Sequence, residues 1–577
     1  MARRSPLRAL VWAGVLTALI AAPGAFSAAA ETPLRIGLAE EPRTLNVWLA
    51  SDVNSNNILS QIYQPLYLRE PEALDMIPWL AAAPPEYDPE TVSYRVRLRP
   101  ARWSDGSALT SRDVAFTCRL IQEFKIPRHY SRWKFVKRIE TPDDHTVRFV
   151  LDKPMAIFVT RSLTIPIVSE KEWREVADRA RTREKPLAAL LQHPVQTPLG
   201  AGPFTLIHWR PGAYLHMEKN PYFFADGLTI AGRTLGPYVQ KVLYKIYGTS
   251  DVAMLALKKG TIDMYWQGIQ PGYIEGLSRH PQIRVYSCER SALYYMGFNV
   301  RRPPFDDPVL RRAVAVLIDK NFIVKRILQG YGNPMVSIVP AGNTFWHNPA
   351  LPDYGDDLGR DDRIRAAARM LQGAGYRWET PPVDDRGEVV SPKGLRMPDG
   401  SPFPEFEILT PPADYDPHRA ISGLMIQEWL RQIGMPAAAR PMAFGALLQQ
   451  VKARHDFDAF ILGYGSLSLD PDYLRVFFHS AFDRERGWNM SGYHNPEFDL
   501  IADASQGAMD LQERRALIYR MQEIIAEDVP YLPLYRPRMI EAVRTDHYTG
   551  WVPMLEGIGN LWSFCQLKPV SGEPETN

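Results

Sequence analysis

The chain has 577 residues, of which 45% are hydrophobic and 23% are charged, with 14 tryptophans and 26 tyrosines. This composition is typical of a folded globular protein, and the length exceeds what one hydrophobic core usually supports, so we expect two or three domains. The formal net charge is only +2. Without a basic stripe, the sequence gives no reason to expect nucleic acid as a partner.

The first 30 residues have the pattern of a secretory signal peptide. Arginines open the segment, an apolar stretch runs from Leu10 to Ala22, and small residues lead up to Glu31. The apolar stretch is shorter than the roughly 18 residues that usually span a bilayer, so we expect cleavage before Glu31 rather than an anchor. No cysteine stands at the start of the mature chain to carry a lipid. We therefore expect a free periplasmic protein.

Strands and helices alternate in the rest of the chain. Strands are predicted at 94–98 and 146–151, where apolar residues alternate, and the first leads into a polar turn at 103–106. Pro- and Gly-rich passages at 71–89 and 381–404 are predicted to be a crossing between domains and a surface loop. The tail after Pro569 is expected to fray.

Two helices carry clear sequence signals. One is predicted to begin with Asp307 as its cap, because apolar residues then fall on one face: Val309, Leu310, Ala313, Val314, Leu317 and Ile318. A second is predicted to end at Gly434, with its apolar face formed by Ile421, Leu424, Met425 and Ile433. The mixture of helices and strands predicts an α/β fold.

No motif of a known enzyme class is expected to act in this chain. It has no nucleophile elbow, zinc-protease, Walker or dinucleotide motif, and Ser131–Lys134 fits S-x-x-K without the companion elements. Cys118, Cys288 and Cys565 match no metal-ligand spacing, and one disulfide among them stays possible. We expect that the protein binds no metal and no cofactor and is not an enzyme. A hydrolase that uses a pair of carboxylates stays an alternative, because the chain has 65 acidic residues.

Several short motifs follow one another in a characteristic order. They comprise 94–106 with 109–116 (WSDG, then LTSRDVAF), 197–204 (TPLGAGPF), 219–223 (KNPYF), 260–263 (GTID), 297–299 (GFN), 304–307 (PFDD) and 492–499 (GYHNPEFD). In this order the chain resembles the bacterial extracellular solute-binding proteins of family 5, the oligopeptide- and dipeptide-binding type, over nearly its whole mature length. The glycines and prolines of these motifs themselves suit tight turns, so we expect most of them to build the scaffold.

The resemblance implies a two-lobed α/β periplasmic binding protein (type II, cluster C) with an extra subdomain in the N-terminal lobe. Lobe I would comprise 31–70, 197–290 and 540–570, the subdomain 71–196, and lobe II 291–539. The implied function is the monomeric substrate-binding component of an ABC importer, which closes around a peptide-like ligand and docks on the permease subunits. The same fold is compatible with an oligosaccharide, an opine, a metal complex or haem as ligand, and with a receptor-docking or chaperone-like role.

The resemblance also suggests two runs of ligand contacts, Tyr265-Trp266-Gln267 and Tyr464-Gly465-Ser466-Leu467. In peptide-binding relatives the backbone of the second run pairs with the extended peptide. Leu467 takes the place of the aspartate that holds the peptide's ammonium in those relatives. Because a leucine cannot pair a buried cation, we expect peptides with a free amino terminus to bind weakly, and Leu467→Asp to improve their binding.

Other residues are candidates with an equally good packing explanation. Glu40 or Asp52 is an alternative partner for an ammonium, and Arg454 a partner for a carboxylate. Asn56, Tyr130, Trp133 and Asn489 are further residues expected to face the cleft.

Overall fold

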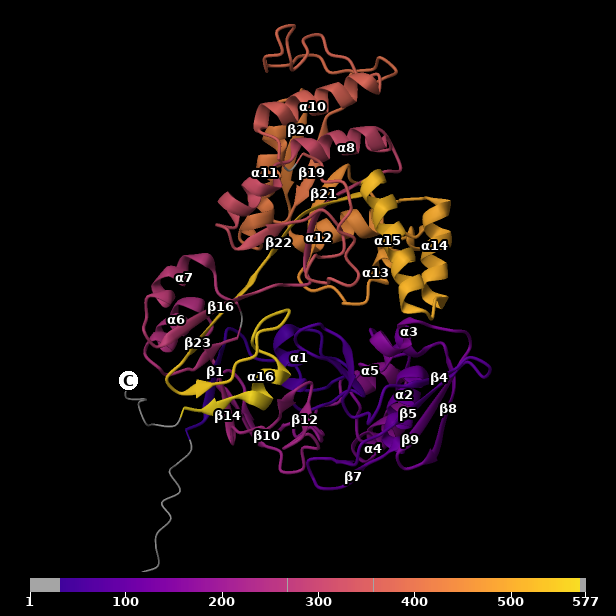
Figure 1. The fold of residues 1–577 in the computed structure, drawn as a ribbon, viewed down its shortest axis with the longest axis vertical. Coiled ribbons are helices and arrows are strands. Elements are labelled where there is room, and N and C mark those ends of the chain that lie inside the picture. Colours follow the sequence, from indigo (N-terminus) through magenta and orange to yellow (C-terminus); the bar gives the residue numbers. More distant parts are fainter. Residues whose placement is uncertain (1–31, 267, 356, 571–577) are drawn as a thin grey trace, which may run out of the picture. The chain divides into compact units, whose positions relative to one another are not determined.

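A computed structural model gives the fold of residues 32–266, 268–355 and 357–570 (Figure 1). Helices and strands alternate along these residues, so the predicted α/β class is confirmed. The predicted signal peptide, Gln267 and residues 571–577 lie outside the described residues. Within the described ranges, no helix combines the length and the apolar content that crossing a membrane requires.

A seven-stranded sheet forms the centre of the part that we call lobe I. Its strands, in order, are β10 (Phe204–Arg210), β11 (Tyr214–Lys219), β14 (Lys241–Ile246), β1 (Leu34–Leu38), β15 (Met264–Tyr265), β23 (Met539–Arg544) and β16 (Ile283–Cys288). The central strand β1 runs parallel to both its neighbours, and Leu34, Ile36 and Leu38 on it are fully buried. The helices of this part are α1 (Val53–Leu59), α6 (Ser250–Lys258), α7 (Pro271–Ser278) and α16 (Leu561–Gln566).

A six-stranded sheet forms the centre of lobe II. Its order is β18 (Gly332–Pro334), β22 (Tyr531–Pro537), β17 (Leu293–Phe298), β21 (Ala459–Tyr464), β19 (Phe406–Thr410) and β20 (Ala437–Pro441). Its helical segments are α8 (Pro308–Leu317), α9 (Lys320–Phe322), η2 (Ile323–Ile327), α10 (Arg360–Gly373), α11 (Pro417–Arg431), α12 (Phe444–Leu448), η3 (Gln449–Arg454), α13 (Tyr473–Phe478), η4 (Ser480–Phe482), α14 (Pro496–Gly507) and α15 (Leu511–Asp528).

A four-stranded antiparallel sheet forms the centre of the subdomain. Its order is β4 (Glu86–Asp88), β5 (Ser93–Arg97), β9 (Thr146–Leu151) and β8 (Val136–Asp143), so the two predicted strands exist and pair with each other. Its helical segments are α2 (Ser111–Phe124), α3 (Tyr130–Trp133), η1 (Phe158–Ser162), α4 (Glu170–Arg181) and α5 (Pro186–Leu191). The small sheets pair β2 (Tyr67–Arg69) with β3 (Met76–Pro78), β6 (Ala101–Arg102) with β7 (Ala108–Leu109), β12 (Thr229–Ile230) with β13 (Arg233–Thr234), and β24 (Tyr548–Thr549) with β25 (Lys568–Pro569).

Both predicted helices exist, but the residues predicted to be buried agree with the structure only in part. Helix α8 begins as predicted, because the Asp307 side chain accepts a hydrogen bond from the Val309 N–H at 2.8 Å. On α11 the predicted apolar face is half wrong: Ile421 and Leu424 are exposed, whereas Met425 packs against the core and Ile433, just after the helix, is buried. The buried face instead contains Gly423, where a Cβ atom would lie 2.5 Å from a Thr410 side-chain carbon. The absence of a side chain at 423 therefore lets the helix pack closely on β19.

The motif glycines at 200 and 202 act as scaffold. A Cβ atom on Gly200 would lie 2.1 Å from the Ile62 carbonyl oxygen, and one on Gly202 would lie 2.1 Å from the Gln61 carbonyl oxygen. Because these obstacles are backbone atoms, no side chain fits at either position. The three cysteines are buried and unpaired, so none of them forms the disulfide that the sequence left possible.

The chain passes between the two lobes twice, at a hinge. Residues 289–292 join β16 to β17, and Arg538 joins β22 to β23, which Figure 1 shows as one run of yellow chain. Glu289 binds both guanidinium groups of this second crossing, with Arg536 at 2.6 Å and Arg538 as a close ion pair. Glu556 accepts a hydrogen bond from the Ser291 N–H at 2.7 Å. The crossings are therefore tied together mainly by side chains.

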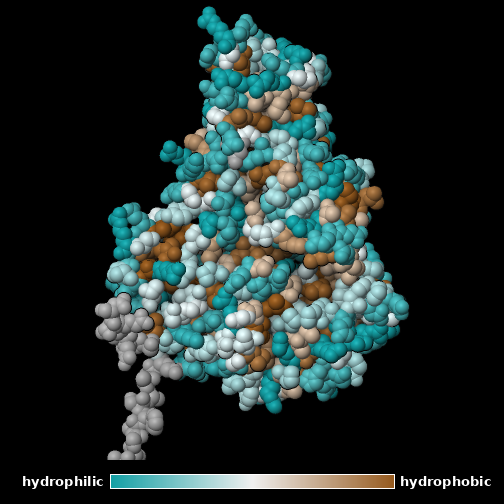
Figure 2. Space-filling view, in the orientation of Figure 1, coloured by the Kyte–Doolittle hydropathy of each residue, from teal (hydrophilic) through white to brown (hydrophobic). Residues whose placement is uncertain are grey.

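The face drawn in Figure 2 mixes hydrophilic and hydrophobic side chains. Hydrophobic colour gathers over the region of α6 and α7, where Val252 and Leu255 on α6 are exposed.

Candidate functional site

A cleft with a volume of about 460 Å³ takes its walls from lobe I, the subdomain and lobe II. Ligand sites typically have volumes of about 300–1,000 Å³, so the cleft is large enough for a small solute. Its lining residues are Ser60, Tyr63, Gln64, Pro65, Tyr67, Leu68, Arg69, Thr160, Thr164, Pro166, Ser468, Leu469, Met554, Asn560, Leu561 and Trp562.

Much of the lobe I wall is held in place by hydrogen bonds within the protein. The Gln64 side chain accepts a bond from Trp79 Nε1 at 2.7 Å and donates one to the Ser60 carbonyl at 2.9 Å. Asn560 donates to the Val552 carbonyl at 2.8 Å and caps α16. These amides are therefore occupied by protein partners and set the shape of the wall.

The subdomain contacts lobe II at the edge of the cleft. The Thr160 hydroxyl donates to Asp470 Oδ2 at 2.7 Å, and Arg161 Nη1 lies 2.8 Å from Asp472 Oδ2. We call this pair of contacts the latch. Since it joins the subdomain to lobe II, the latch stabilises this arrangement of the two parts.

The latch depends on a buried ion pair inside lobe II. Arg514 donates two hydrogen bonds of 2.8 Å to the two oxygens of Asp470, whose side chain is fully buried. Burial opposes the ionisation of Asp470, but the charge and hydrogen bonds of Arg514 and the bond from Thr160 hold its pKa at about 2. Asp470 therefore offers Thr160 a charged acceptor at neutral pH.

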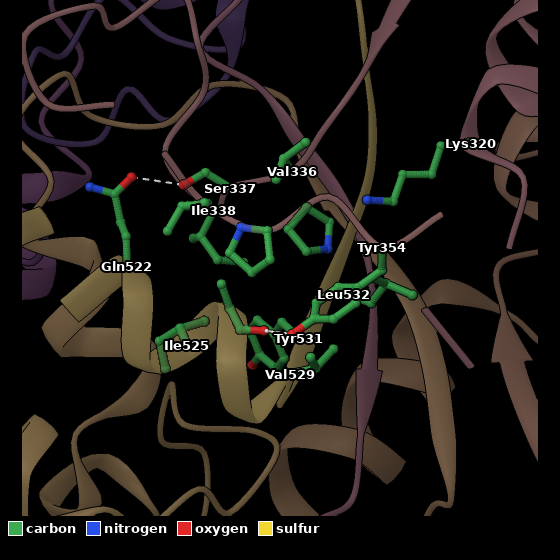
Figure 3. Close-up of a pocket in the computed structure, with 14 residues that line it drawn as sticks. Lys320, Val336, Ser337, Ile338, Tyr354, Gln522, Ile525, Val529, Tyr531 and Leu532 are labelled. Atoms are coloured by element: carbon green, nitrogen blue, oxygen red, sulfur yellow. Dashed lines mark hydrogen bonds between the residues drawn. The ribbon is translucent and has the colours of Figure 1, made fainter. Parts of the chain in front are cut away.

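A second, enclosed cavity lies within lobe II but has a volume of only about 20 Å³. Figure 3 shows it between β22, α15 and the segment at 336–338, with Ser337 donating a hydrogen bond to the Gln522 side chain at 2.8 Å. A space of this size holds about one water molecule, so it is not a ligand site.

The predicted run at 464–467 lies beside the hinge. The Gly465 carbonyl accepts a hydrogen bond from Arg290 Nη2 at 2.8 Å, and the Leu467 N–H donates to the Ser291 carbonyl. Two backbone groups of the run are thus paired within the protein, which leaves fewer for a ligand strand. Ser466 is exposed beside them.

The side chains of this run pack on lobe II. Tyr464 stacks on Phe477, with ring centres 4.7 Å apart, and Leu467 is 7% exposed within an apolar cluster. A carboxylate at position 467 would therefore lie in an apolar environment instead of facing the cleft. The cleft wall begins one residue later, at Ser468 and Leu469.

The other predicted run, at 265–267, is covered by lobe I. Tyr265 is buried on β15, and its hydroxyl lies 3.3 Å from Ser250 Oγ. Trp266 packs on Phe564 with ring centres 5.2 Å apart. Gln267 lies outside the described residues. The burial of Tyr265 and Trp266 favours a packing role for both.

The remaining candidates are scattered. Trp133 is buried in the subdomain against Phe158, and Tyr130 is half-buried at the start of the same short helix. Asn56 is exposed on α1, and Arg454 is exposed at the end of η3. None of these four lines the cleft described above.

The alternative ammonium partners have local roles. Asp52 caps α1 by accepting a hydrogen bond from the Ser55 N–H at 2.8 Å, and Glu40 is exposed after β1. Neither lines the cleft.

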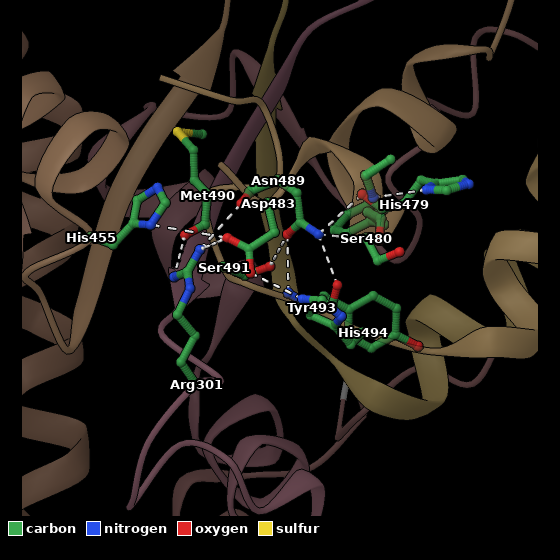
Figure 4. A network of polar contacts seen from close by, with 12 residues as sticks. Arg301, His455, His479, Ser480, Asp483, Asn489, Met490, Ser491, Tyr493 and His494 are labelled. Atoms are coloured by element: carbon green, nitrogen blue, oxygen red, sulfur yellow. Dashed lines mark hydrogen bonds and ion pairs between the residues drawn. The ribbon is translucent and has the colours of Figure 1, made fainter. Parts of the chain in front are cut away.

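Asn489 organises a polar network inside lobe II (Figure 4). Its Nδ2 donates to the Tyr493 carbonyl at 2.8 Å, and its Oδ1 accepts from the Tyr493 N–H at 3.0 Å. Arg301 donates to the Met490 carbonyl at 3.1 Å and pairs with Asp483 at 2.5 Å in the same network. These contacts favour a structural role for Asn489.

None of the described residues that the sequence predicted as ligand contacts is among the residues that line the cleft. Arg69, Thr160 and Trp562 carry no local signal of ligand binding, because the structure brings them together from distant parts of the chain. Ser468 and Leu469 directly follow the predicted run, so extending that run by two residues would have included them.

The sequence is similar to a family of bacterial binding proteins. The sequence profile of the bacterial extracellular solute-binding proteins, family 5, matches residues 75–484. The chain is 26% identical to the oligopeptide-binding protein AppA of Bacillus subtilis, over 87% of this chain and 86% of that protein. It is 24% identical to the probable D,D-dipeptide-binding periplasmic protein DdpA of Escherichia coli, over 96% of this chain and 99% of that protein.

Solved structures share the fold. A periplasmic oligopeptide-binding protein of Thermotoga maritima matches with a TM-score of 0.75 and 20% identity, over 93% of this chain and 99% of that chain. AppA of Bacillus subtilis in complex with a nonapeptide matches with a TM-score of 0.67 and 24% identity, over 94% and 99%. The predicted two-lobed fold is thereby confirmed.

Proposed function

Because the chain belongs to the bacterial extracellular solute-binding proteins of family 5, we propose that it captures a peptide or peptide-like solute in the cleft and delivers it to an ABC importer. The observation that carries this proposal is the cleft itself, which takes residues from both lobes beside a two-stranded hinge. A ligand in that position contacts both walls only when the lobes are closed, so its binding energy favours closure.

A peptide is preferred over the other ligand classes because AppA and DdpA are named as peptide-binding proteins. We also propose that residues 1–30 direct export and are removed before Glu31, which leaves a periplasmic protein that acts as a monomer with the permease subunits. Intact mass measured on the periplasmic fraction tests the cleavage site. A mass that retains residues 1–30 would contradict it.

The cleft can be tested by filling it. The protein is purified from the periplasm, the co-purified solute is identified by native mass spectrometry, and its affinity is measured by calorimetry. Ser468→Trp places an indole in the cleft wall and is expected to weaken binding at least about tenfold, which corresponds to about 1.4 kcal/mol. Ser391→Trp, in an exposed loop of lobe II, is the control and should bind as the wild type does. Unchanged binding by Ser468→Trp would move the ligand site out of this cleft.

A further inference from the structure

Arg69 stands out in the cleft wall by its charge. Among the described residues that line the cleft, it alone carries a formal charge, and the others are apolar or neutral polar. It ends β2, and its backbone carbonyl accepts a hydrogen bond from Trp562 Nε1 at 3.0 Å, so both residues are fixed in the same wall.

The Arg69 guanidinium is poorly neutralised. Its Nη1 donates one hydrogen bond, to the Leu74 carbonyl at 2.6 Å, and no carboxylate of the described chain lies within 4.0 Å of it. Burial lowers the pKa of Arg69, whereas the carboxylates of Asp470 and Asp75 raise it from a greater distance. Because an arginine has five N–H donors and stays charged in proteins, several donors remain for a ligand.

The carboxylate of the nearby latch is not available to Arg69. Asp470 is bound by Arg514 through two hydrogen bonds of 2.8 Å and by Thr160 at 2.7 Å. An acidic group with these partners has little capacity left for another cation. The Arg69 guanidinium is therefore free to pair with an anionic group of a ligand.

The described wall has no group that could neutralise a cationic ligand. It contains no aspartate or glutamate, and its amides are occupied by Trp79, Ser60 and Val552. A ligand ammonium in this cleft would lose its hydration without gaining a counter-ion, which is costly. The unpaired guanidinium of Arg69 and the lack of an acidic residue in the described wall thus both favour an anionic ligand group over a cationic one.

From this juxtaposition we propose that the ligand is held by an anionic group, a carboxylate on Arg69, and that it buries no ammonium in the cleft. The proposal rests on the proposed function and specifies the chemistry of the solute. Arginine suits this role because its planar donors match both oxygens of a carboxylate. The carboxylate is either the terminal group of a peptide or an acidic side chain.

The test compares two forms of one probe. A library of N-acetylated pentapeptides is synthesised as free acids and as carboxamides, each form is incubated with the full mature protein, and retained peptides are identified by mass spectrometry after gel filtration. Hydrogen bonds to charged groups correspond to about a ten- to hundredfold difference in affinity, so acids should be retained over amides by at least tenfold. Enrichment of Asp or Glu among retained amides would assign the group to a side chain.

Variants locate the effect. Arg69→Gln should abolish the preference for acids, whereas Arg69→Lys should keep part of it. The matched control is Arg102→Gln, which removes an exposed guanidinium that likewise donates one hydrogen bond to a backbone carbonyl, that of Gly106 at 2.8 Å. The control should keep the full preference. The comparison of acids with amides on the wild type needs no variant, so it stands even if Arg69→Gln fails to fold.

The outcomes separate the two levels of the argument. Retention of neither form would overturn the proposed function, and the inference with it. Equal retention of acids and non-acidic amides by the wild type would leave the proposed function standing and overturn the inference. A preference that survives in Arg69→Gln would assign the carboxylate to another residue and equally overturn it.

Discussion

Leu467 lies in the loop after β21, with its side chain among apolar residues of lobe II. We expect Leu467→Asp to lower the free energy of unfolding by about 3–5 kcal/mol at pH 7, because it buries an unpaired charge. Urea denaturation at pH 7 measures this loss. The loss should shrink steadily as pH falls from 7 towards about 4, since burial raises the pKa of the new carboxyl and the folded state takes up a proton that the unfolded chain still releases in that range.

Ser466→Asp is the control for this change. Ser466 is exposed one residue earlier in the loop, so the same substitution there should alter stability by no more than about 0.5 kcal/mol. If Leu467→Asp were as stable as the wild type and bound free-amino peptides more tightly, the side chain would face the ligand, as the family resemblance implies.

Gly202 permits a different test at the residue scale. Gly202→Ala places a Cβ atom 2.1 Å from the Gln61 carbonyl oxygen, so the backbone must shift, and we expect a loss of about 2–4 kcal/mol in thermal or urea unfolding. Gly272→Ala, in α7 with no atom within 4 Å of the new carbon, should be neutral or slightly stabilising. Equal effects of the two substitutions would show that the motif glycine is not there for close packing.

Residues with a local cause were predictable from the sequence. The cap at Asp307 is local, because its side chain bonds the N–H group two residues later. The glycines at 200 and 202 indicate by their residue type that the backbone is constrained there. Arg69 and Thr160 were not predictable, because their roles depend on neighbours such as Asp470, which is 310 positions away from Thr160. Pattern and propensity describe neighbours along the chain, and not those across a cleft.

At the scale of elements, β23 carries a buried acid close to the hinge. Glu541 accepts hydrogen bonds from the N–H groups of Ile558 at 2.5 Å and Gly559 at 3.4 Å. Burial raises the pKa of Glu541 to about 7, against the hydrogen bonds and the charge of Arg290. Between its ordinary pKa near 4.5 and about 7, the folded protein therefore holds a proton that the unfolded chain has released.

This proton makes stability depend on pH. The free energy of unfolding should fall as pH rises from about 4.5 to about 7, because in that range the folded state keeps a proton that the unfolded chain has released. In Glu541→Gln this part of the pH dependence is absent, so the variant should gain about 1–3 kcal/mol relative to the wild type across that range. Urea denaturation at several pH values measures the difference.

Glu405→Gln is the control, since Glu405 is exposed next to β19 and its replacement should leave the pH profile unchanged. Parallel profiles for the wild type and Glu541→Gln would mean that Glu541 does not titrate in this range.

The periodicity of apolar residues predicted where several strands and helices lie, but it did not always predict which face of an element is buried. Strands β5 and β9 lie where alternating residues predicted them. On α11 the large residues Ile421 and Leu424 suggested the wrong face, because the close approach to β19 selects small residues there. Hydrophobicity alone does not report where a helix must fit tightly.

At the scale of the whole molecule, the latch should affect closure. We expect the double variant Thr160→Val/Arg161→Gln to bind the co-purified solute more weakly, because it removes contacts to Asp470 and Asp472 that the closed state makes. Small-angle scattering should show a smaller radius of gyration for the wild type with saturating solute than without it. The variant should need more solute to reach the same radius.

Arg174→Gln is the matched control. It removes a surface arginine whose ion pair, with Glu170, stays within the subdomain, and it should close as the wild type does. A radius that does not change with solute in the wild type would contradict closure altogether.

The order of strands in lobe I has a consequence for how the chain acquires its structure. Strand β23 lies between β15 and β16, although β16 ends at Cys288 and β23 begins only at Met539. The six-stranded sheet draws only on residues 293–537, and its first and last long strands, β17 and β22, are neighbours. Strand β22 ends at Pro537 and β23 begins at Met539, so the two sheets receive these inner strands from one continuous segment near the C-terminal end. Completion of both lobes therefore depends on contacts distant in sequence, which form slowly.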